Sequence, residues 1–180
     1  MSKLIIFLNG PAGSGKDTIG RFLVDKFSKA GLYKFAEPLK RAVGSFFSLN
    51  EEEYSYYFET QQGKATVGPR FYNKTPREWL IGFSELYAKT LGGKDVFGKL
   101  CAKKIETNFN NGTHEVAIIT DSGFVEEAKA VVDSFKGEDV DFLVVRLERD
   151  GLSFSGDSRG YFDLTGLCVN IKNKEGDAVS

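Results

Sequence analysis

The sequence has few of the side chains that build metal centres. Its 180 residues include two cysteines, Cys101 and Cys168, and one histidine, His114. The cysteines lie far apart and form no CxxC pair, so we expect no recognisable metal site from these residues. Each cysteine is more typical of a buried apolar residue, which fits a reducing cytoplasm.

An excess of charge of either sign and long hydrophobic runs are also lacking. The formal net charge is −1, so nothing global draws the chain to nucleic acid or to a membrane. No stretch approaches the roughly 20 apolar residues of a membrane span. The opening MSKLIIFLNG has too short an apolar run for a signal peptide. These absences favour small-molecule chemistry in the cytoplasm.

The apolar pattern that is present predicts strands alternating with helices. We expect strands at 3–8, 33–36, 115–120, 141–148 and 167–173, and helices at about 15–30, from Pro38, 75–91, 96–108 and 125–135. Alternation of this kind is typical of an α/β fold with a mostly parallel sheet and helices on both faces. The length suits a single domain over residues 1–180.

Turn and capping residues divide these elements. Gly31 is expected to stop the first helix, and Thr75 with Glu78 forms a capping box before the helix at 75–91. Segment 49–74 mixes acids and aromatics and is expected to be an irregular excursion. Segment 149–166 has turn residues throughout and is expected to be a long mobile loop.

A glycine-rich turn, NGPAGSGKDTIG, follows the first strand and carries the clearest chemical signal. Gly10, four residues, then Gly15-Lys16 matches the phosphate-loop pattern up to its last position. Glycines allow N–H groups to surround an anion, the helix start adds positive charge, and a lysine reaches the β and γ phosphates. The residues expected to bind phosphate are Gly10, Ala12, Gly13, Ser14, Gly15, Lys16, Asp17 and Thr18. The alternative is a turn that is glycine-rich only for tightness.

Asp17 stands where the phosphate loop usually has Ser or Thr, and Thr18 follows it. A carboxylate is a hard ligand that suits Mg²⁺ directly or through water, and the Thr18 hydroxyl is a second candidate ligand. The alternative is that Asp17 only stabilises the helix N-terminus.

GPAGSGKDT resembles the loop of P-loop nucleoside monophosphate kinases, which have Thr one place after the usual position. The bacteriophage-type deoxynucleoside monophosphate kinases are the nearer resemblance, through blocks in the same order over nearly the whole chain: FAEPLK (35–40), NKTPREWL (73–80), GKDVFGKLCAKKI (93–105), TDSGFVEEA (120–128) and ERDGLSFSGDSR (148–159). The resemblance implies a P-loop kinase fold with a five-stranded sheet. It also implies γ-phosphoryl transfer from ATP, with Mg²⁺, to a (deoxy)nucleoside monophosphate, in the host cytoplasm if the chain is phage-encoded.

This family points to further catalytic residues. Arg149 and Arg159 bracket the loop 149–166, which is expected to close over ATP as a lid; the alternative is two solvated charges. Asp121 stands where an acidic residue usually holds Mg²⁺ through water, with a helix N-cap as the alternative. One departure is Gly123, because the family usually has an arginine at that position.

Three cations are candidates for the acceptor phosphate: Lys40, Arg70 and Arg77. The alternatives are solvated side chains or, for Arg77, a pair with Glu78 or Glu85. An aromatic cluster could stack on a base, although core packing is the commoner role; it comprises Phe46, Phe47, Tyr54, Tyr56, Tyr57 and Phe58.

Two rival functions remain open on the sequence alone. One is a P-loop kinase for another small acceptor, of the dephospho-coenzyme-A or shikimate type. The other is a nucleotide-binding regulator that has lost catalysis, which the missing cation at Gly123 invites. The sequence leaves open which bases are accepted and whether the chain forms a homodimer.

Overall fold

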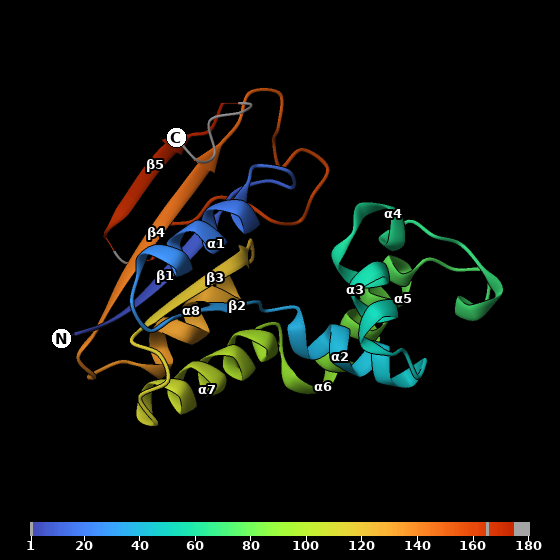
Figure 1. Ribbon diagram of the computed structural model, residues 1–180, viewed down its shortest axis with the longest axis horizontal. Helices are drawn as coiled ribbons and strands as arrows, with labels where there is room; N and C mark the ends of the chain where they lie inside the picture. The colour runs from blue at the N-terminus through green and yellow to red at the C-terminus, as the bar shows by residue number, and fades with distance from the viewer. Residues whose placement is uncertain (1, 165, 175–180) are drawn as a thin grey trace. The chain divides into compact units, whose positions relative to one another are not determined.

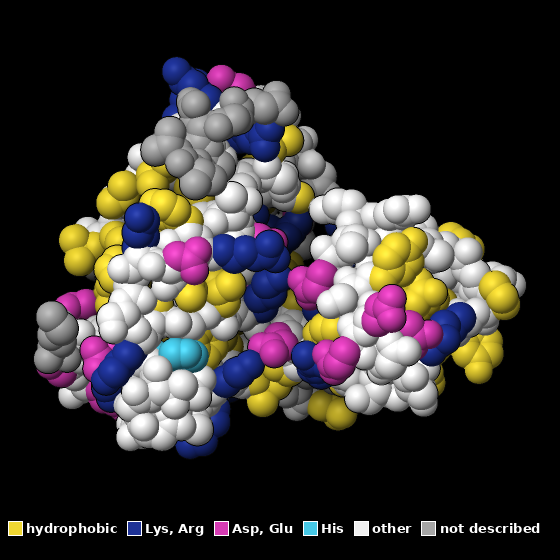
Figure 2. All heavy atoms as spheres, viewed as in Figure 1, with side chains coloured by type: hydrophobic (Ala, Val, Ile, Leu, Met, Phe, Trp, Pro, Cys, Tyr) yellow, Lys and Arg dark blue, Asp and Glu magenta, His cyan; other side chains and the backbone are white. Residues whose placement is uncertain are grey.

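The computed structural model describes residues 2–164 and 166–174. The chain separates into two compact units, one formed by Met1–Phe35 with Gly98–Ser180 and the other by Ala36–Phe97. Basic and acidic side chains both occur on the face shown in Figure 2, in keeping with the net charge of −1. Of the helices in the described ranges, none combines the length and the hydropathy needed to cross a bilayer.

The first unit is built on a five-stranded parallel sheet (Figure 1). Its strands are β1 (Lys3–Asn9), β2 (Ala30–Tyr33), β3 (Val116–Ser122), β4 (Val140–Glu148) and β5 (Cys168–Lys172), in the order β2-β3-β1-β4-β5. Every pairing is parallel. The α/β prediction is therefore confirmed, and the sheet, expected to be mostly parallel, is parallel throughout.

Helices cover both faces of this sheet because the crossovers run in opposite directions. From β1 the chain crosses toward β2 through α1 (Lys16–Lys26), and from β3 it crosses the other way to β4 through α8 (Val125–Ser134). Right-handed crossovers in opposite directions place these helices on opposite faces. On one face the buried cluster around Ile6 and Leu8 packs against residues of α1.

Helix α7 (Val96–Asn110), which belongs to the first unit from Gly98 onward, packs beside α8. A Cβ atom on Gly98 would lie 2.2 Å from the carbonyl oxygen of Glu127, so only glycine permits this approach of the two helices. Further along, the rings of Phe109 and Phe135 are 5.9 Å apart. The helices predicted at 96–108 and 125–135 are thus confirmed.

Two boundaries in the first unit differ from prediction. Helix α1 ends at Lys26, and β2 occupies 30–33 instead of 33–36. Gly31, expected to stop the helix, lies within β2, where a Cβ atom would be 2.2 Å from the His114 ring. A glycine is therefore needed at position 31 because the His114 ring lies so close. The local sequence does not reveal this contact.

The second unit is helical. It contains α2 (Glu37–Phe46), α3 (Glu51–Glu59), α4 (Gln61–Lys64), the 3₁₀ turn η1 (Pro69–Phe71), α5 (Pro76–Phe83), the π-helical segment η2 (Ser84–Ala88) and α6 (Lys89–Gly92). Val43, Tyr54 and Phe58 form its buried core. The capping box of Thr75 and Glu78 is confirmed at the start of α5.

Segment 49–74 is not the irregular excursion that the sequence suggested. It contains α3 and α4, and α3 begins with a second capping box between Asn50 and Glu53. The Asn50 side chain accepts from the Glu53 amide, and the Glu53 carboxylate accepts from the Asn50 amide. This is the same signal that correctly located α5, so the sequence did contain the information.

Candidate functional site

The topology brings three loops to one edge of the sheet. Strands β1 and β3 are neighbours in the sheet. The chain leaves β1 toward β2 and leaves β3 toward β4, so the two connections run in opposite directions. In open parallel sheets, ligands bind beyond the carboxyl ends of the strands at such a reversal point. The segments that follow β1, β3 and β4 begin at this edge, and they carry the residues predicted to act on phosphate.

The segment after β1 has the shape of a phosphate loop. Gly13 and Gly15 have φ of 81° and 95°, the left-handed region that favours glycine. A Cβ atom on Gly10 would lie 2.6 Å from Ser14 Oγ and 2.7 Å from the Leu147 carbonyl oxygen. Position 10 therefore tolerates no larger residue without movement of the backbone.

The loop presents donors that no residue described in the structure satisfies. The backbone amides of Gly13, Gly15, Lys16 and Thr18 donate no hydrogen bond to any residue of 2–164 or 166–174. Within the same ranges the buried Ser14 Oγ also has no partner. Buried polar groups are normally paired, so this loop fits an anionic ligand. Ala12 lies exposed at its tip.

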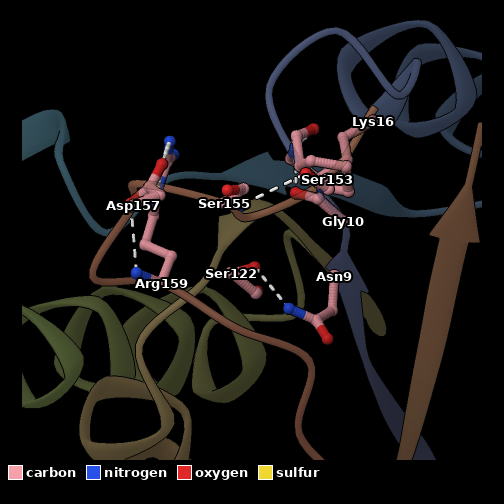
Figure 3. A network of polar contacts seen from close by, with 9 residues as sticks. Asn9, Gly10, Lys16, Ser122, Ser153, Ser155, Asp157 and Arg159 are labelled. Atoms are coloured by element: carbon pink, nitrogen blue, oxygen red, sulfur yellow. Dashed lines mark hydrogen bonds and ion pairs between the residues drawn. The ribbon is translucent and has the colours of Figure 1, made fainter. Parts of the chain in front are cut away.

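Lys16 is folded back over the loop in this structure. Its Nζ donates to the carbonyl oxygens of Gly10 at 2.6 Å and Pro11 at 2.7 Å (Figure 3). Burial, followed by repulsion from Arg159, lowers the pKa of Lys16 to about 8. A partly buried ammonium beside a second cation is stabilised when an anion binds between them.

Two side chains from other elements hold the loop in place. Asn173, which follows β5, donates from Nδ2 to the Ser14 carbonyl oxygen at 3.0 Å and packs against Gly15. Arg149, which follows β4, donates from Nη1 to the Gly13 carbonyl oxygen at 3.1 Å. Asn173 was not singled out from the sequence, because a polar residue after an edge strand carries no distinctive signal.

Asp17 and Thr18 differ in their surroundings. Asp17 Oδ1 accepts from the Thr120 hydroxyl at 3.0 Å and lies 3.3 Å from the Lys34 ammonium. Thr18 is exposed, and its hydroxyl forms no hydrogen bond in the part of the chain that the structure describes. Asp17 thus connects α1 to the neighbouring strand ends, whereas the Thr18 hydroxyl is available to a ligand.

Asp121 lies inside β3 and has a structural contact. Its Oδ1 accepts from the Phe35 amide at 2.8 Å. The helix N-cap role, which was the alternative for Asp121, does not occur, because α8 starts at Val125 with Phe124 at its N-cap. The Asp121 charge still acts on both Lys16 and Arg159, raising the pKa of each.

Arg159 reaches the site across Gly123. Its side-chain carbons lie so close to Gly123 that a Cβ atom there would be 2.6 Å from Arg159 Cδ. Its guanidinium pairs with both carboxylate oxygens of Asp157. Gly123 stands where deoxynucleoside monophosphate kinases, which the sequence resembles, usually have an arginine. Here the glycine makes room for the side chain of Arg159.

Asn9, another residue not singled out from the sequence, ties the base of the loop 149–166 to the sheet, and Figure 3 shows its side chain beside Ser122 of β3. It is fully buried at the end of β1. Its Nδ2 donates to the carbonyl oxygens of Ser122 and Gly160, both at 3.0 Å, and its Oδ1 accepts from the Phe162 amide at 3.1 Å. Within the described residues of 149–166, which exclude 165, there is no helix or strand.

Two acceptor candidates in the second unit already have partners. Lys40 is buried in α2, and its Nζ lies 2.7 Å from Glu59 Oε1. Arg70 pairs with Glu53 at 2.8 Å and also donates to the Phe47 carbonyl oxygen. These contacts give both cations a structural role in joining the helices of this unit.

Arg77 is different. It lies exposed in the first turn of α5 and has no hydrogen bond or ion pair with any described residue. The alternative pairs do not form, because Glu78 pairs with Lys74 and Glu85 with Lys89.

The aromatic cluster divides between core and surface. Tyr54 and Phe58 are core residues, the Phe47 ring packs on Phe71, and Tyr56 packs on Tyr57. Phe46 is 58% exposed.

The site suits a magnesium–polyphosphate ligand better than a bare metal. Among the described residues, no three His, Cys, Asp or Glu side chains gather as a metal cluster. Mg²⁺ bound with phosphate needs few protein ligands, since phosphate oxygens and water complete its octahedron. The Thr18 hydroxyl and the carboxylates of Asp17 and Asp121 are hard oxygen donors of this kind.

Comparisons with known proteins extend this picture at the level of fold. No protein-family model matches the chain, and no curated protein matches it significantly. The structure of a "putative kinase" from Chloroflexus aurantiacus aligns with a TM-score of 0.56 at 9% identity, over 100% of this chain and 93% of that one. This likeness shows a shared fold, an α/β arrangement built on a five-stranded parallel sheet.

Two weaker likenesses have TM-scores below 0.5. The Mycobacterium tuberculosis APS kinase, solved with AMPPNP and APS, has a TM-score of 0.49 at 14% identity, over 94% of this chain and 88% of that one. A Janibacter sugar kinase has a TM-score of 0.47 at 9% identity, over 96% of this chain and 86% of that one.

Proposed function

We propose that this protein transfers the γ-phosphoryl group of ATP to a (deoxy)nucleoside monophosphate. The observation that carries the proposal is the loop after β1, where four backbone amides and a buried hydroxyl have no partner among the described residues and Lys16 lies beside them. Such an array stabilises several phosphate oxygens at once, and a strand, loop and helix present it in the order that phosphate loops require.

Several residues of the first unit have a role in this reaction. ATP, when bound, supplies the phosphoryl group and the leaving group. The loop amides hold the phosphate chain, and Lys16 exchanges its contacts with Gly10 and Pro11 for phosphate oxygens. The Arg159 guanidinium gives up its pair with Asp157 and binds the transferring phosphoryl group, where its planar array of N–H donors stabilises charge on phosphate oxygens. Arg149 keeps the loop in shape through Gly13.

Mg²⁺ would be held on the Thr18 side of the loop. The Thr18 hydroxyl is the candidate direct ligand, and the Asp17 and Asp121 carboxylates are candidates to hold metal-bound water. Both carboxylates already accept hydrogen bonds, from Thr120 and Phe35, and these bonds fix their orientation.

The order of sequence blocks supports a nucleotide acceptor. The blocks at 35–40, 73–80, 93–105, 120–128 and 148–159 resemble those of deoxynucleoside monophosphate kinases in sequence and in order. Arg77, a cation in the block at 73–80 without a partner among the described residues, is the candidate for binding the acceptor phosphate.

A panel of acceptors with γ-labelled ATP and Mg²⁺ tests this proposal. We expect label to move to one or more nucleoside or deoxynucleoside monophosphates, and we expect Lys16→Ala to abolish transfer. Transfer only to a non-nucleotide, such as shikimate or dephospho-coenzyme A, would refute the acceptor. Binding of ATP without transfer to any acceptor would indicate a regulator instead of an enzyme.

A further inference from the structure

The peptide group between Ser14 and Gly15 depends on a residue outside the phosphate loop for its orientation. Its N–H, on Gly15, donates to no described residue, and its carbonyl oxygen, on Ser14, accepts from Asn173 Nδ2 at 3.0 Å. The peptide groups on either side are held within the segment. The Ser14 amide donates to the Pro11 carbonyl oxygen at 3.3 Å, and the Gly15 carbonyl oxygen accepts from the Ile19 amide at 3.0 Å.

A peptide group that precedes a glycine can turn over at little cost. Gly15 has φ of 95° and lies at the N-cap of α1. Turning the group over changes ψ of Ser14 and φ of Gly15, and glycine adopts positive and negative φ about equally readily. The N–H and C=O of a trans peptide point in opposite directions. One orientation therefore presents the Gly15 N–H to an anion, and the other presents the Ser14 carbonyl oxygen, which repels it.

Asn173 is anchored on the sheet and selects one of these orientations. It follows β5 and is buried, and its backbone amide donates to the Glu148 carbonyl oxygen of β4 at 2.7 Å. Its side chain makes one hydrogen bond in the part of the chain that the structure describes, the bond from Nδ2 to the Ser14 oxygen. A Cβ atom on residue 15 would lie 2.6 Å from Nδ2, so the glycine also admits this contact.

We propose that Asn173 is a positioning residue for nucleotide binding. By holding the Ser14 carbonyl oxygen against the end of β5, it turns the Gly15 N–H toward the phosphate chain. The inference rests on the proposed function, because it takes the ligand of the loop to be a nucleotide polyphosphate. It adds a determinant of affinity that lies outside the loop and acts through another residue.

Two substitutions at position 173 separate the hydrogen bond from its loss of contact. Asn173→Ala removes the donor. Asn173→Asp keeps the shape of the side chain but places a carboxylate oxygen, which accepts hydrogen bonds, against the Ser14 oxygen, and this repulsion favours the turned-over peptide. Asn170→Asp is the matched control, because it adds the same charge at an exposed position of the same strand.

Calorimetric titration of Mg²⁺–ATP into the full chain measures the effect on affinity. We expect the Kd to rise about tenfold in Asn173→Ala and about 100-fold or more in Asn173→Asp, because a donor to charged phosphate is lost and then replaced by an acceptor. Asn170→Asp should stay within about twofold of the wild type. The fitted stoichiometry reports the folded fraction of each variant, and Asn173→Ala carries the test if Asn173→Asp does not fold.

Nuclear magnetic resonance of the ¹⁵N-labelled chain observes the peptide group itself. In the wild type, we expect the Gly15 amide proton to shift downfield when Mg²⁺–ATP binds, because its N–H gains a phosphate oxygen. The shift should be much smaller in the variants at position 173. A purely structural role would lower the folded fraction and leave the Gly15 shift of the folded, ligand-saturated protein unchanged.

The outcomes distinguish the positioning role from the proposed function. Phosphoryl transfer with wild-type affinity in both variants at position 173, or with an unchanged Gly15 shift, would overturn the positioning role alone. Equal losses in Asn173→Asp and Asn170→Asp would also overturn it, because the added charge would then be the cause. ATP binding that depends on Asn173, without transfer to any acceptor, would refute the proposed function and support the positioning role. Absence of ATP binding by the wild type would refute both.

Discussion

The side chain of Arg159 occupies the space that a Cβ atom on residue 123 would need. An ideal Cβ at Gly123 would lie 2.6 Å from Arg159 Cδ and 2.8 Å from Cγ. The Gly160 amide also donates to the Gly123 carbonyl oxygen, which fixes the backbone beside Arg159. Gly123 and Arg159 therefore act together, because the glycine leaves the space that the Arg159 side chain occupies.

Gly123→Ala is expected to displace Arg159 and to lower kcat roughly 10–100-fold, because misplacing a group that stabilises the transferring phosphoryl is costly. The KM for ATP should change little. Gly160→Ala is the matched control, since a Cβ there meets nothing within 4 Å. Steady-state kinetics of the two variants measure the difference, and similar values of kcat would contradict the account.

Asn9→Ala is expected to lower the free energy of unfolding by about 2–3 kcal/mol, because it leaves the Ser122 and Gly160 carbonyl groups and the Phe162 amide without their buried partner. Urea unfolding measures this loss. Asn170→Ala, at an exposed position of β5, should change stability by less than about 0.5 kcal/mol. An equally small effect at Asn9 would show that its network is not structural.

The affinity for metal-free ATP is expected to fall above about pH 8, where Lys16 of the free protein loses its proton. Only the charged ammonium attracts polyphosphate, so affinity should be level below this pKa and fall by up to about tenfold per pH unit above it. Lys16→Arg, which stays charged, should remove the dependence. Calorimetric titrations across this window provide the measurement, and a level profile for the wild type would contradict the assignment.

The same pKa has a consequence for folding. Between about pH 8 and the ordinary lysine value of 10.5, the unfolded chain keeps a proton that the folded chain has released. The contribution of Lys16 to stability therefore rises with pH across that interval and is least favourable below it. A comparison of wild type and Lys16→Met in urea at several pH values would detect the slope.

Thr18→Val is expected to raise the Mg²⁺ concentration for half-maximal turnover by about tenfold or more. The substitution removes the hydroxyl and keeps the shape of the side chain. Asp17→Asn should have a smaller effect on this concentration, because Thr120 can still donate to the remaining oxygen. An unchanged Mg²⁺ titration in Thr18→Val would remove this hydroxyl from the metal site.

The sequence predicted the parallel sheet and most helices because their apolar periodicity is strong. Glycine spacing and the following lysine are local features, and they predicted a phosphate loop after the first strand, where the structure has a turn with positive φ at Gly13 and Gly15. The predictions for β2 and for 49–74 were wrong for different reasons. Gly31 is required by a contact with distant His114, whereas the Asn50 capping box was a local signal that the acidic and aromatic composition obscured.

The parts of the site that could not be predicted depend on tertiary contacts. Asn9 and Asn173 are ordinary polar residues at strand ends until the fold brings Gly160 and Ser14 to them. Gly123 looked like a missing cation, and only the structure shows the stem of Arg159 in its place.

Calorimetric titration of Mg²⁺–ATP into the full chain tests the central claim most directly, because that claim concerns amides around Lys16 that lack a partner among the described residues. We predict saturable binding at one site, weakened about 100-fold or more in Lys16→Ala. No heat of binding in the wild type, or equal affinity in the variant, would contradict it.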